Sequence, residues 1–370
     1  MLIYGIVLFL VIVYGIYPYK KHNSRQSKKI FLILSFATMA FVLGLRGNSV
    51  GEDTGHYLLV FKYSANVKWT DMLHSGGMRT GYFTDEYGYT DTIENGFLVL
   101  AKIVHCFTDN GHVFLFIIAA ITCALFAKFI YDNCQKVFFP TFIFLCESMF
   151  MFAFNGVRQI LAVAIVMQAY TLLKKNKWKK ALATIAIAAL FHNVALVGIV
   201  LFPIAFIKPK KEFKAFKYAI IATVASPFVI VLCQSIIIKF FPRYRLYFTT
   251  NYWGNSLGGT AILWLFEFLL ILIAYRRKFI YKKKLKGENS FKTACLVLIY
   301  LACELMGLRI TMFSRVGWFF RSYLMLFLPE CEYYFSKKVW KIVKAILIIL
   351  MLLLYYSYAS SSSRNYSFCF

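Results

Sequence analysis

Long apolar runs separated by short polar and basic segments make up most of this chain. A helix that crosses a bilayer needs about 20 mainly apolar residues. Runs near that length lie at roughly 2–17, 30–45, 113–131, 138–154, 156–173, 216–240, 260–275, 292–308, 316–330 and 339–357, and the first two should extend into their flanks. The pattern predicts an all-α polytopic integral membrane protein, with roughly 10–12 transmembrane helices plus re-entrant or half helices. No strands are expected, because backbone in lipid must form its hydrogen bonds within helices.

The composition supports lipid as the solvent of this chain. Apolar residues make up 60% and charged residues 16%, whereas soluble domains carry about 25% charge. The net charge of +26 is concentrated in short loops, where it sets membrane orientation, so nucleic acid is not an expected partner. The nine cysteines are scattered without a CxxC pair, so neither a metal site nor a disulfide framework is indicated.

Basic loops predict the orientation of the chain. Cytoplasmic loops are enriched in lysine and arginine, and the five densest groups lie near 20–29, 174–180, 208–217, 276–286 and 337–344. The N-terminus is then outside, and so is the polar segment 46–95, which holds seven of the 16 acids. We therefore expect a single transmembrane domain, 1–370, with 46–95 as an extracytoplasmic segment within it.

Two apolar stretches do not fit as simple crossings. With 46–95 outside and run 113–131 entering from outside, segment 96–108 should be a re-entrant or interfacial helix. Segment 181–207 has dense lysine on both flanks, so it should be a hairpin of two half-length helices with His192-Asn193 near its apex. Non-helical backbone at membrane depth needs protein or water around it, so both segments indicate an outward-facing cavity.

Arginine is distributed differently from lysine. Nine of the 12 arginines lie outside the basic loops, and most are at outer helix ends: Arg46, Arg79, Arg158, Arg243, Arg245, Arg309, Arg315, Arg321 and Arg364. Arginine is suited to gripping phosphate or carboxylate through two parallel hydrogen bonds. Positive charge on the outer side opposes the orientation rule, so these arginines need another reason.

Five groups of ionisable or polar residues are candidates for chemistry, since ionisable groups in a membrane or at its outer rim are functional candidates by default. They are Arg46-Gly47 with Asp53 and Tyr57; Glu94-Asn95-Gly96-Phe97; Asn155 to Gln159 with Arg158; Phe191-His192-Asn193; and Arg309, Arg315 and Arg321, with Glu304 or Glu267 as partners of Arg321. Structural alternatives are a capped loop, an acid at a helix start, a core histidine and an ion pair.

In this order and spacing the groups resemble the EpsG family of bacterial exopolysaccharide proteins, a branch of the Wzy-type polysaccharide polymerases. The resemblance runs from Arg46 to about residue 207. Its motifs are Arg46-Gly47, Asp53-Thr54 with Tyr57, Glu94-x-Gly96-Phe97, Asn155-Gly156-Val157-Arg158-Gln159-x-Leu161-Ala162, and Phe191-His192. Asn193 departs from the pattern, which has a small or basic residue there. Beyond residue 207 only hydropathy and scattered arginines match.

The resemblance implies a glycosyltransferase of the bacterial cytoplasmic (inner) membrane that acts in exopolysaccharide or capsule biosynthesis. It would polymerise undecaprenyl-diphosphate-linked oligosaccharides at the outer leaflet, without a cofactor. Membrane lipid surrounds such a protein, and a flippase and a chain-length regulator are its candidate protein partners. The growing chain would pass from its lipid diphosphate to the next unit.

This chemistry assigns roles to the candidate residues. Arginines should hold the diphosphate and stabilise the charge of the leaving group. Arg158 and Arg315 are the first choices, supported by Arg46, Arg309 and Arg321, while Tyr57 and Gln159 would contact substrate. The attacking sugar hydroxyl needs a base, for which His192, Glu94 and Asp53 are the candidates. His192 is slightly preferred, and Glu94 remains its rival.

Other functions fit parts of the pattern. A lipid-linked oligosaccharide flippase would also carry inward arginines, but two related halves are expected there and no duplication is found. An O-antigen-ligase-like glycosyltransferase would look nearly identical in sequence. A membrane O-acyltransferase with a catalytic histidine would leave the outer arginines unexplained.

Overall fold

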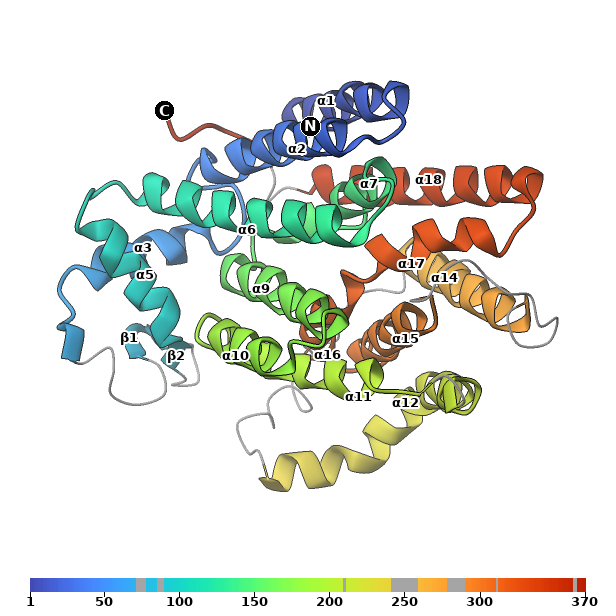
Figure 1. Cartoon of the computed structure of the whole chain (residues 1–370). Coiled ribbons are helices and arrows are strands. Elements are labelled where there is room, and N and C mark those ends of the chain that lie inside the picture. Colours follow the sequence, from blue (N-terminus) through green and yellow to red (C-terminus); the bar gives the residue numbers. More distant parts are fainter. Residues whose placement is uncertain are drawn as a thin grey trace. The chain divides into compact units, whose positions relative to one another are not determined.

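The computed structural model describes residues 1–70, 78–84, 90–208, 211–240, 259–277, 290–310, 312–361 and 365–370. The chain forms two compact units, the first of Met1–Ile199 with Tyr355–Phe370 and the second of Val200–Leu354. Both consist almost entirely of helices (Figure 1), as predicted for an all-α polytopic membrane protein.

Ten helices and a 3-10 segment build the described part of the first unit. They are α1 (Leu2–Lys20), α2 (Arg25–Gly44), α3 (Thr54–Ser64), α5 (Asn95–His105), α6 (Gly111–Asn133), α7 (Phe138–Cys146), α8 (Met149–Phe152), α9 (Val157–Lys174), α10 (Trp178–Ala189), the 3-10 segment η1 (Asn193–Val200) and the end of α18 (Lys337–Ala359). As expected, the first two extend beyond their apolar runs. Their turn closes with Ser24, whose hydroxyl accepts from the Ser27 amide.

The second unit holds the other helices of the described chain. They are α11 (Leu201–Ala205), α12 (Glu212–Phe240), α14 (Gly259–Tyr275), α15 (Ser290–Gly307), α16 (Met312–Arg321), α17 (Leu324–Glu330), the 3-10 turn η5 (Cys331–Tyr333) and most of α18. The predicted run 316–330 is divided between α16 and α17. Buried Arg321 and Ser322 lie at the break, where a continuous apolar helix was expected.

The prediction that the chain has no strands is wrong. Strands β1 (Met78–Thr84) and β2 (Thr90–Ile93) pair antiparallel, with Met78 opposite Ile93 and an irregularity between Arg79 and Thr84. They fall inside the polar segment 46–95. The argument against strands applies to backbone in lipid, whereas water can satisfy the open edges of a hairpin outside it.

Six helices in the described residues are long and apolar enough to cross a membrane by length and composition: α1, α2, α6, α9, α12 and α18. The other predicted crossings fall on shorter or interrupted helices. Run 138–154, for example, is broken between α7 and α8, where Ser148 takes the left-handed conformation at φ 64° beside the buried Glu147. The hydropathy of the run does not predict a break of this kind in the helix.

Segment 181–207 turns back on itself after α10, as its flanking lysines predicted. A methyl group placed on Gly198 of η1 would lie 3.3 Å from the side chain of Ile185 in α10. In one continuous helix these residues would be about 20 Å apart. His192 and Asn193 therefore lie at the apex of a hairpin, whose second half begins as a 3-10 helix.

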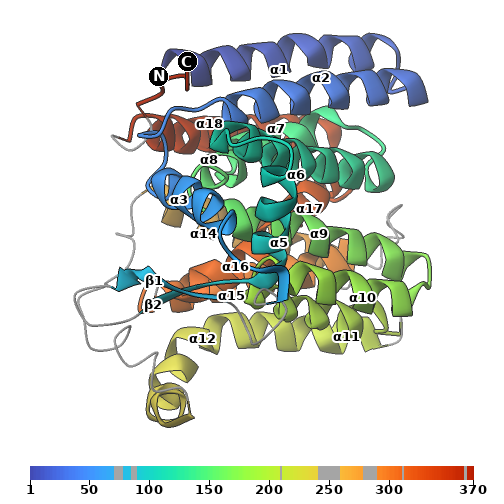
Figure 2. The same ribbon diagram turned by 90° about the vertical axis from the view of Figure 1, so that its left-hand side faces the viewer.

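The short helices α3 and α5 pack together and against the N-terminal half of α6 (Figure 2). Helix α5 has 11 residues, or about 16 Å, so it is too short to cross the membrane, as predicted. Their shared core includes Phe61, Phe97 and Phe114, all 1% exposed or less. This apolar core fixes the starts of α3 and α5, where Tyr57 and Glu94 lie.

Candidate functional site

Glu94 is the centre of a charged cluster in the first unit. Its Oε2 atom accepts from Arg158, and its Oε1 atom lies 3.1 Å from Nδ1 of His192 and 3.1 Å from the Asn193 amide nitrogen. The side chains of Glu94 and Arg158 are 9% and 13% exposed. Three motifs that are far apart in the sequence therefore meet at one carboxylate.

Glycine 96 allows α5 to approach the hairpin apex closely. Its amide donates to the Leu190 carbonyl at 2.8 Å, and a Cβ at this position would lie 2.6 Å from that oxygen. Glu94 is the N-cap of α5, so this contact holds its carboxylate beside residues 190–193. The Glu94-x-Gly96 spacing thus has a direct physical reason.

Arg158 links the cluster to helix α3. It lies in the first turn of α9, pairs with Glu94 and donates a hydrogen bond to the hydroxyl of Tyr57, which is buried. A cation at a helix N-terminus opposes the macrodipole. The Glu94 carboxylate offsets that disadvantage.

The electrostatics keep Glu94 ionised. Burial alone would raise the pKa of its carboxyl, but the hydrogen bond to His192, the charge of Arg158 and the Asn193 amide together hold that pKa below its ordinary value. Burial also raises the pKa of Tyr57, and the nearby Arg158 only partly counters this. Both groups therefore keep their ordinary forms at neutral pH, Glu94 as carboxylate and Tyr57 as phenol.

His192 presents its two ring nitrogens differently. An ionised carboxylate only accepts hydrogen bonds, so Nδ1 facing Glu94 must carry a proton. The other nitrogen, Nε2, is enclosed and has no hydrogen-bond partner within the described residues. In a neutral ring this nitrogen holds the lone pair.

Arg46 lies in the same unit with different surroundings. Its side chain is 1% exposed, Nε donates to Thr54 Oγ1 at 2.9 Å, Nη1 donates to the Leu43 carbonyl at 2.6 Å, and the guanidinium lies over the Phe154 ring. Its contacts within the described residues are with neutral groups. Burial lowers the pKa of Arg46 to about 10, so it stays charged at neutral pH.

The C-terminal segment covers Arg46. The Gly47 amide donates to the Ser367 carbonyl at 2.7 Å, and the Cys369 amide donates to the Leu45 carbonyl at 3.1 Å. Arg46 and Phe368 pair as an isolated antiparallel bridge. The ring of Tyr366 also packs edge-on against Tyr4, which places both termini at one end of the first unit (Figure 2).

The loop after Arg46 packs on the start of α9. Gly51 has φ +88°, and a Cβ there would lie 2.5 Å from the Phe154 carbonyl oxygen, so a side chain would be both strained and in collision. The Glu52 amide donates to Asn155 Oδ1 at 3.2 Å. The motifs around Arg46 and around Arg158 are thus physically joined.

Two further predicted residues lie beside this assembly. Asp53 is exposed at the start of α3, one turn before Tyr57, and its charge acts on the Tyr57 hydroxyl. Gln159 follows Arg158 in α9 and is 5% exposed. Of the predicted bases, His192 and Glu94 are in direct contact with each other.

The predicted arginines of the second unit have their own environment. Arg309 and Arg315 are exposed, near the end of α15 and on α16. Arg321 is 3% exposed, and its guanidinium lies 4.8 Å from the Trp318 ring centroid and 5.4 Å from that of Tyr300. Arg243, Arg245 and Arg364 lie outside the described residues, as does the side chain of Arg79.

Sequence reasoning missed two features of the site. The backbone amide of Asn193 donates a hydrogen bond to Glu94, and a pattern of side chains cannot predict a backbone donor. The C-terminal segment pairs with residues 45–47, although it carries no motif and is far away in the sequence. The interruption of the apolar run at His192-Asn193 was the one sequence signal that pointed to the first feature.

Comparison with known proteins shows the family of this chain. Residues 29–370 match the profile of the EpsG family. An amylovoran biosynthesis protein, AmsC of Erwinia amylovora, is 27% identical over 226 residues, which cover 57% of this chain and 55% of that protein. The match thus spans about half the length of this relative. No solved structure matches the chain significantly. Because the family match covers nearly the whole sequence and includes every motif of the cluster, the chain belongs to the EpsG family.

Proposed function

We propose that this protein acts in exopolysaccharide biosynthesis as a polymerase of lipid-linked oligosaccharide repeat units. Membership of the EpsG family and the likeness to a protein named for amylovoran biosynthesis support the pathway. The donor would be the growing chain on undecaprenyl diphosphate at the outer leaflet of the cytoplasmic membrane. The acceptor would be the next lipid-linked unit.

The observation that carries this proposal is the contact between His192 and Glu94. A carboxylate that accepts from His192, Asn193 and Arg158 is firmly held and ionised, which makes it a weak base. The same carboxylate orients the imidazole and fixes its proton on Nδ1, leaving Nε2 to accept one. We therefore assign the base to His192 and the positioning role to Glu94.

In the reaction, acceptor binding must first open the enclosed Nε2 of His192. The acceptor hydroxyl then gives its proton to Nε2 while its oxygen attacks the anomeric carbon of the donor. The bond between that carbon and the diphosphate oxygen breaks, and the lipid diphosphate leaves with the electron pair. The imidazolium formed on His192 is stabilised by the Glu94 carboxylate 3.1 Å away. Proton transfer of this kind contributes typically 10²–10⁴-fold in rate.

The arginines divide into two roles in this proposal. Arg309 and Arg315 are exposed, so their planar guanidinium groups are the candidates to bind phosphate oxygens of the donor. Arg158 and Tyr57 position Glu94, and Arg46 positions the start of α3 through Thr54. Gln159 and Asp53 stay candidates for sugar contacts at the edge of the cluster.

The test supplies purified protein in nanodiscs with an undecaprenyl-diphosphate-linked repeat unit and resolves the products by length. Wild type should give a ladder of oligomers. His192→Gln should lower the rate of ladder formation by roughly 10²-fold or more while donor binding persists. Glu94→Gln should retain more activity than His192→Gln, because its amide oxygen can still accept from Nδ1.

A matched control comes from the same region. His105 forms a second histidine–carboxylate contact, with Asp109 at 3.3 Å, at the far end of α5. His105→Gln should leave the ladder unchanged. If Glu94→Gln abolishes turnover while His192→Gln keeps it, the assignment of the base is reversed. Absence of any ladder, with transfer of a single preformed chain to another acceptor, would favour an O-antigen-ligase-like enzyme.

A further inference from the structure

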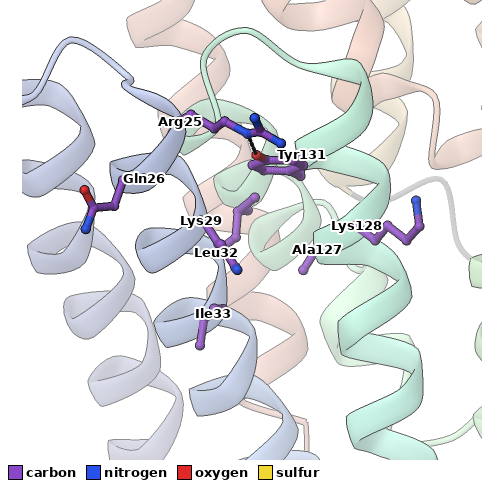
Figure 3. A pocket seen from close by; sticks show the side chains of 8 residues that line it. All are labelled: Arg25, Gln26, Lys29, Leu32, Ile33, Ala127, Lys128 and Tyr131. Carbon is purple, nitrogen blue, oxygen red and sulfur yellow. Dashed lines mark hydrogen bonds between the residues drawn. The ribbon is translucent and has the colours of Figure 1, made fainter.

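A groove lies between α2 and α6 at the end of these helices opposite to Arg46. Its volume is about 710 Å³, within the range of about 300–1,000 Å³ that is usual for ligand pockets. Figure 3 shows Arg25, Lys29 and Tyr131 around the space between the two helices, with Gln26 and Lys128 directed away from it. By the basic loop 20–29, this is the cytoplasmic end.

The packing of the two helices explains why the groove is at this end. At the outer end Gly44 lets α2 and α6 touch, since a Cβ there would lie 2.6 Å from the backbone of Phe116. At the inner end the facing residues are long and charged, and no glycine allows such close contact. The helices therefore leave space where Arg25 and Lys29 face Ala127 and Tyr131 (Figure 3).

The mouth of the groove is positive. Arg25 donates from Nε to the Tyr131 hydroxyl at 3.1 Å, which orients the guanidinium and leaves its other donors for a ligand. Lys28 lies 5.5 Å from the centroid of the Tyr131 ring. Lys29 is one helical turn from Arg25 on the same face of α2. The nearby acid Asp132 is paired with Lys128.

The floor of the groove is apolar. Leu32 and Ile33 follow Arg25 and Lys29 along one face of α2, and Ala127 precedes Tyr131 on α6. Ile33 lies about 12 Å along the helix from Arg25. Leu32 is 3% exposed, whereas Ile33 is 55% exposed, so the lower groove opens sideways at a depth where lipid chains lie. The site thus joins a cationic mouth to an apolar trough.

We propose that this groove binds an anionic glycerophospholipid of the inner leaflet, with its phosphate at Arg25 and Lys29 and an acyl chain along Leu32 and Ile33. Cationic pockets between transmembrane helices on the cytoplasmic side suit lipid head groups of this kind. The charge of the mouth excludes a zwitterionic lipid as the preferred ligand, and the apolar trough distinguishes a lipid from a free phosphate. The proposal is independent of the reaction assigned to His192.

The test is native mass spectrometry of the full chain in detergent, titrated with phosphatidylglycerol, with phosphatidylcholine of the same acyl chains, and with glycerol 3-phosphate. Phosphatidylglycerol should bind roughly tenfold or more tightly than phosphatidylcholine. The double variant Arg25→Gln/Lys29→Gln should remove that preference. Ala127→Phe, which adds bulk to the trough without changing charge, should weaken both lipids.

The matched control is Lys20→Gln/Lys21→Gln, which removes two charges from the same loop outside the groove and should keep the preference. Thermal unfolding of each variant checks that it is folded. Equal binding of the two lipids by wild type would overturn the proposal, and so would an equal loss of preference in the control. Glycerol 3-phosphate binding as tightly as phosphatidylglycerol would identify an anion site in place of a lipid site.

Discussion

Arg158 and Arg46 lie in the same unit and are both largely shielded from solvent, yet their guanidinium groups have different partners. Arg158 is paired with the Glu94 carboxylate and touches Tyr57. Arg46 is more deeply buried, and its contacts within the described residues are a hydroxyl, a carbonyl and an aromatic ring. One arginine is half of an ion pair, and the other is a charge held by neutral groups.

The difference in partners predicts how the removal of each arginine would affect the protein. Removing one member of a buried ion pair leaves the other uncompensated, so Arg158 and Glu94 depend on each other. Arg46 leaves no buried carboxylate behind when it is removed. Its burial disfavours the charged form, as the pKa of about 10 indicates. Arg158 should therefore matter for stability and site geometry together, and Arg46 mainly for geometry.

The largest effect is expected from Arg158→Met. This change leaves the Glu94 carboxylate buried beside His192 without its cation, so the free energy of unfolding should fall by roughly 3 kcal/mol or more. Equilibrium unfolding in mixed micelles measures it. The double variant Arg158→Met/Glu94→Met should regain part of the loss, and strictly additive effects would refute the pairing.

Acid should weaken the same cluster. The pKa of Glu94 is lower in the folded protein than in the unfolded chain, so the carboxylate contributes stability that is fully present above its unfolded pKa. That contribution is lost as pH falls through the lower, folded pKa. Below about pH 5, the difference in unfolding free energy between wild type and Glu94→Gln should shrink as the pH falls further. A difference that grows on acidification would contradict the lowered pKa.

Some of these charged contacts, but not all, could be predicted from the sequence. The basic loops predicted the hairpin at His192, and the motif order selected Glu94, Arg158 and His192 as site residues. Sequence left the base open between His192 and Glu94, because the proposed choice of His192 rests on their contact, which only the fold brings about. It also missed the breaks at Ser148 and after Arg321, since a change of backbone conformation alters no hydropathy.

A smaller effect is expected from deleting residues 366–370, which cover Arg46. The deletion removes the hydrogen bonds from Tyr366 Oη to the Val42 carbonyl, from the Gly47 amide to Ser367 and from the Cys369 amide to Leu45. At about 1 kcal/mol each, the unfolding free energy should fall by roughly 2–3 kcal/mol. Phenylglyoxal should then modify Arg46 faster, as peptide mapping can show. Unchanged protection of Arg46 would mean that the C-terminal segment does not cover it.

The smallest effect on stability should come from substituting Arg46 itself. Comparing methionine with lysine at this position tests whether Arg46, unlike Arg158, lacks an anionic partner. In Arg46→Met, Thr54 Oγ1 still donates to the Val50 carbonyl at 2.6 Å, while the Leu43 carbonyl loses one donor. That loss is offset because a buried charge disappears, so the unfolding free energy should change by no more than about 1 kcal/mol. Arg46→Lys should be worse than Arg46→Met, because an ammonium is more strongly hydrated and cannot reach Thr54 and Leu43 together. Parallel unfolding of the two variants in mixed micelles decides it. If lysine is tolerated and methionine is not, Arg46 has an anionic partner, and the distinction drawn from Arg158 fails.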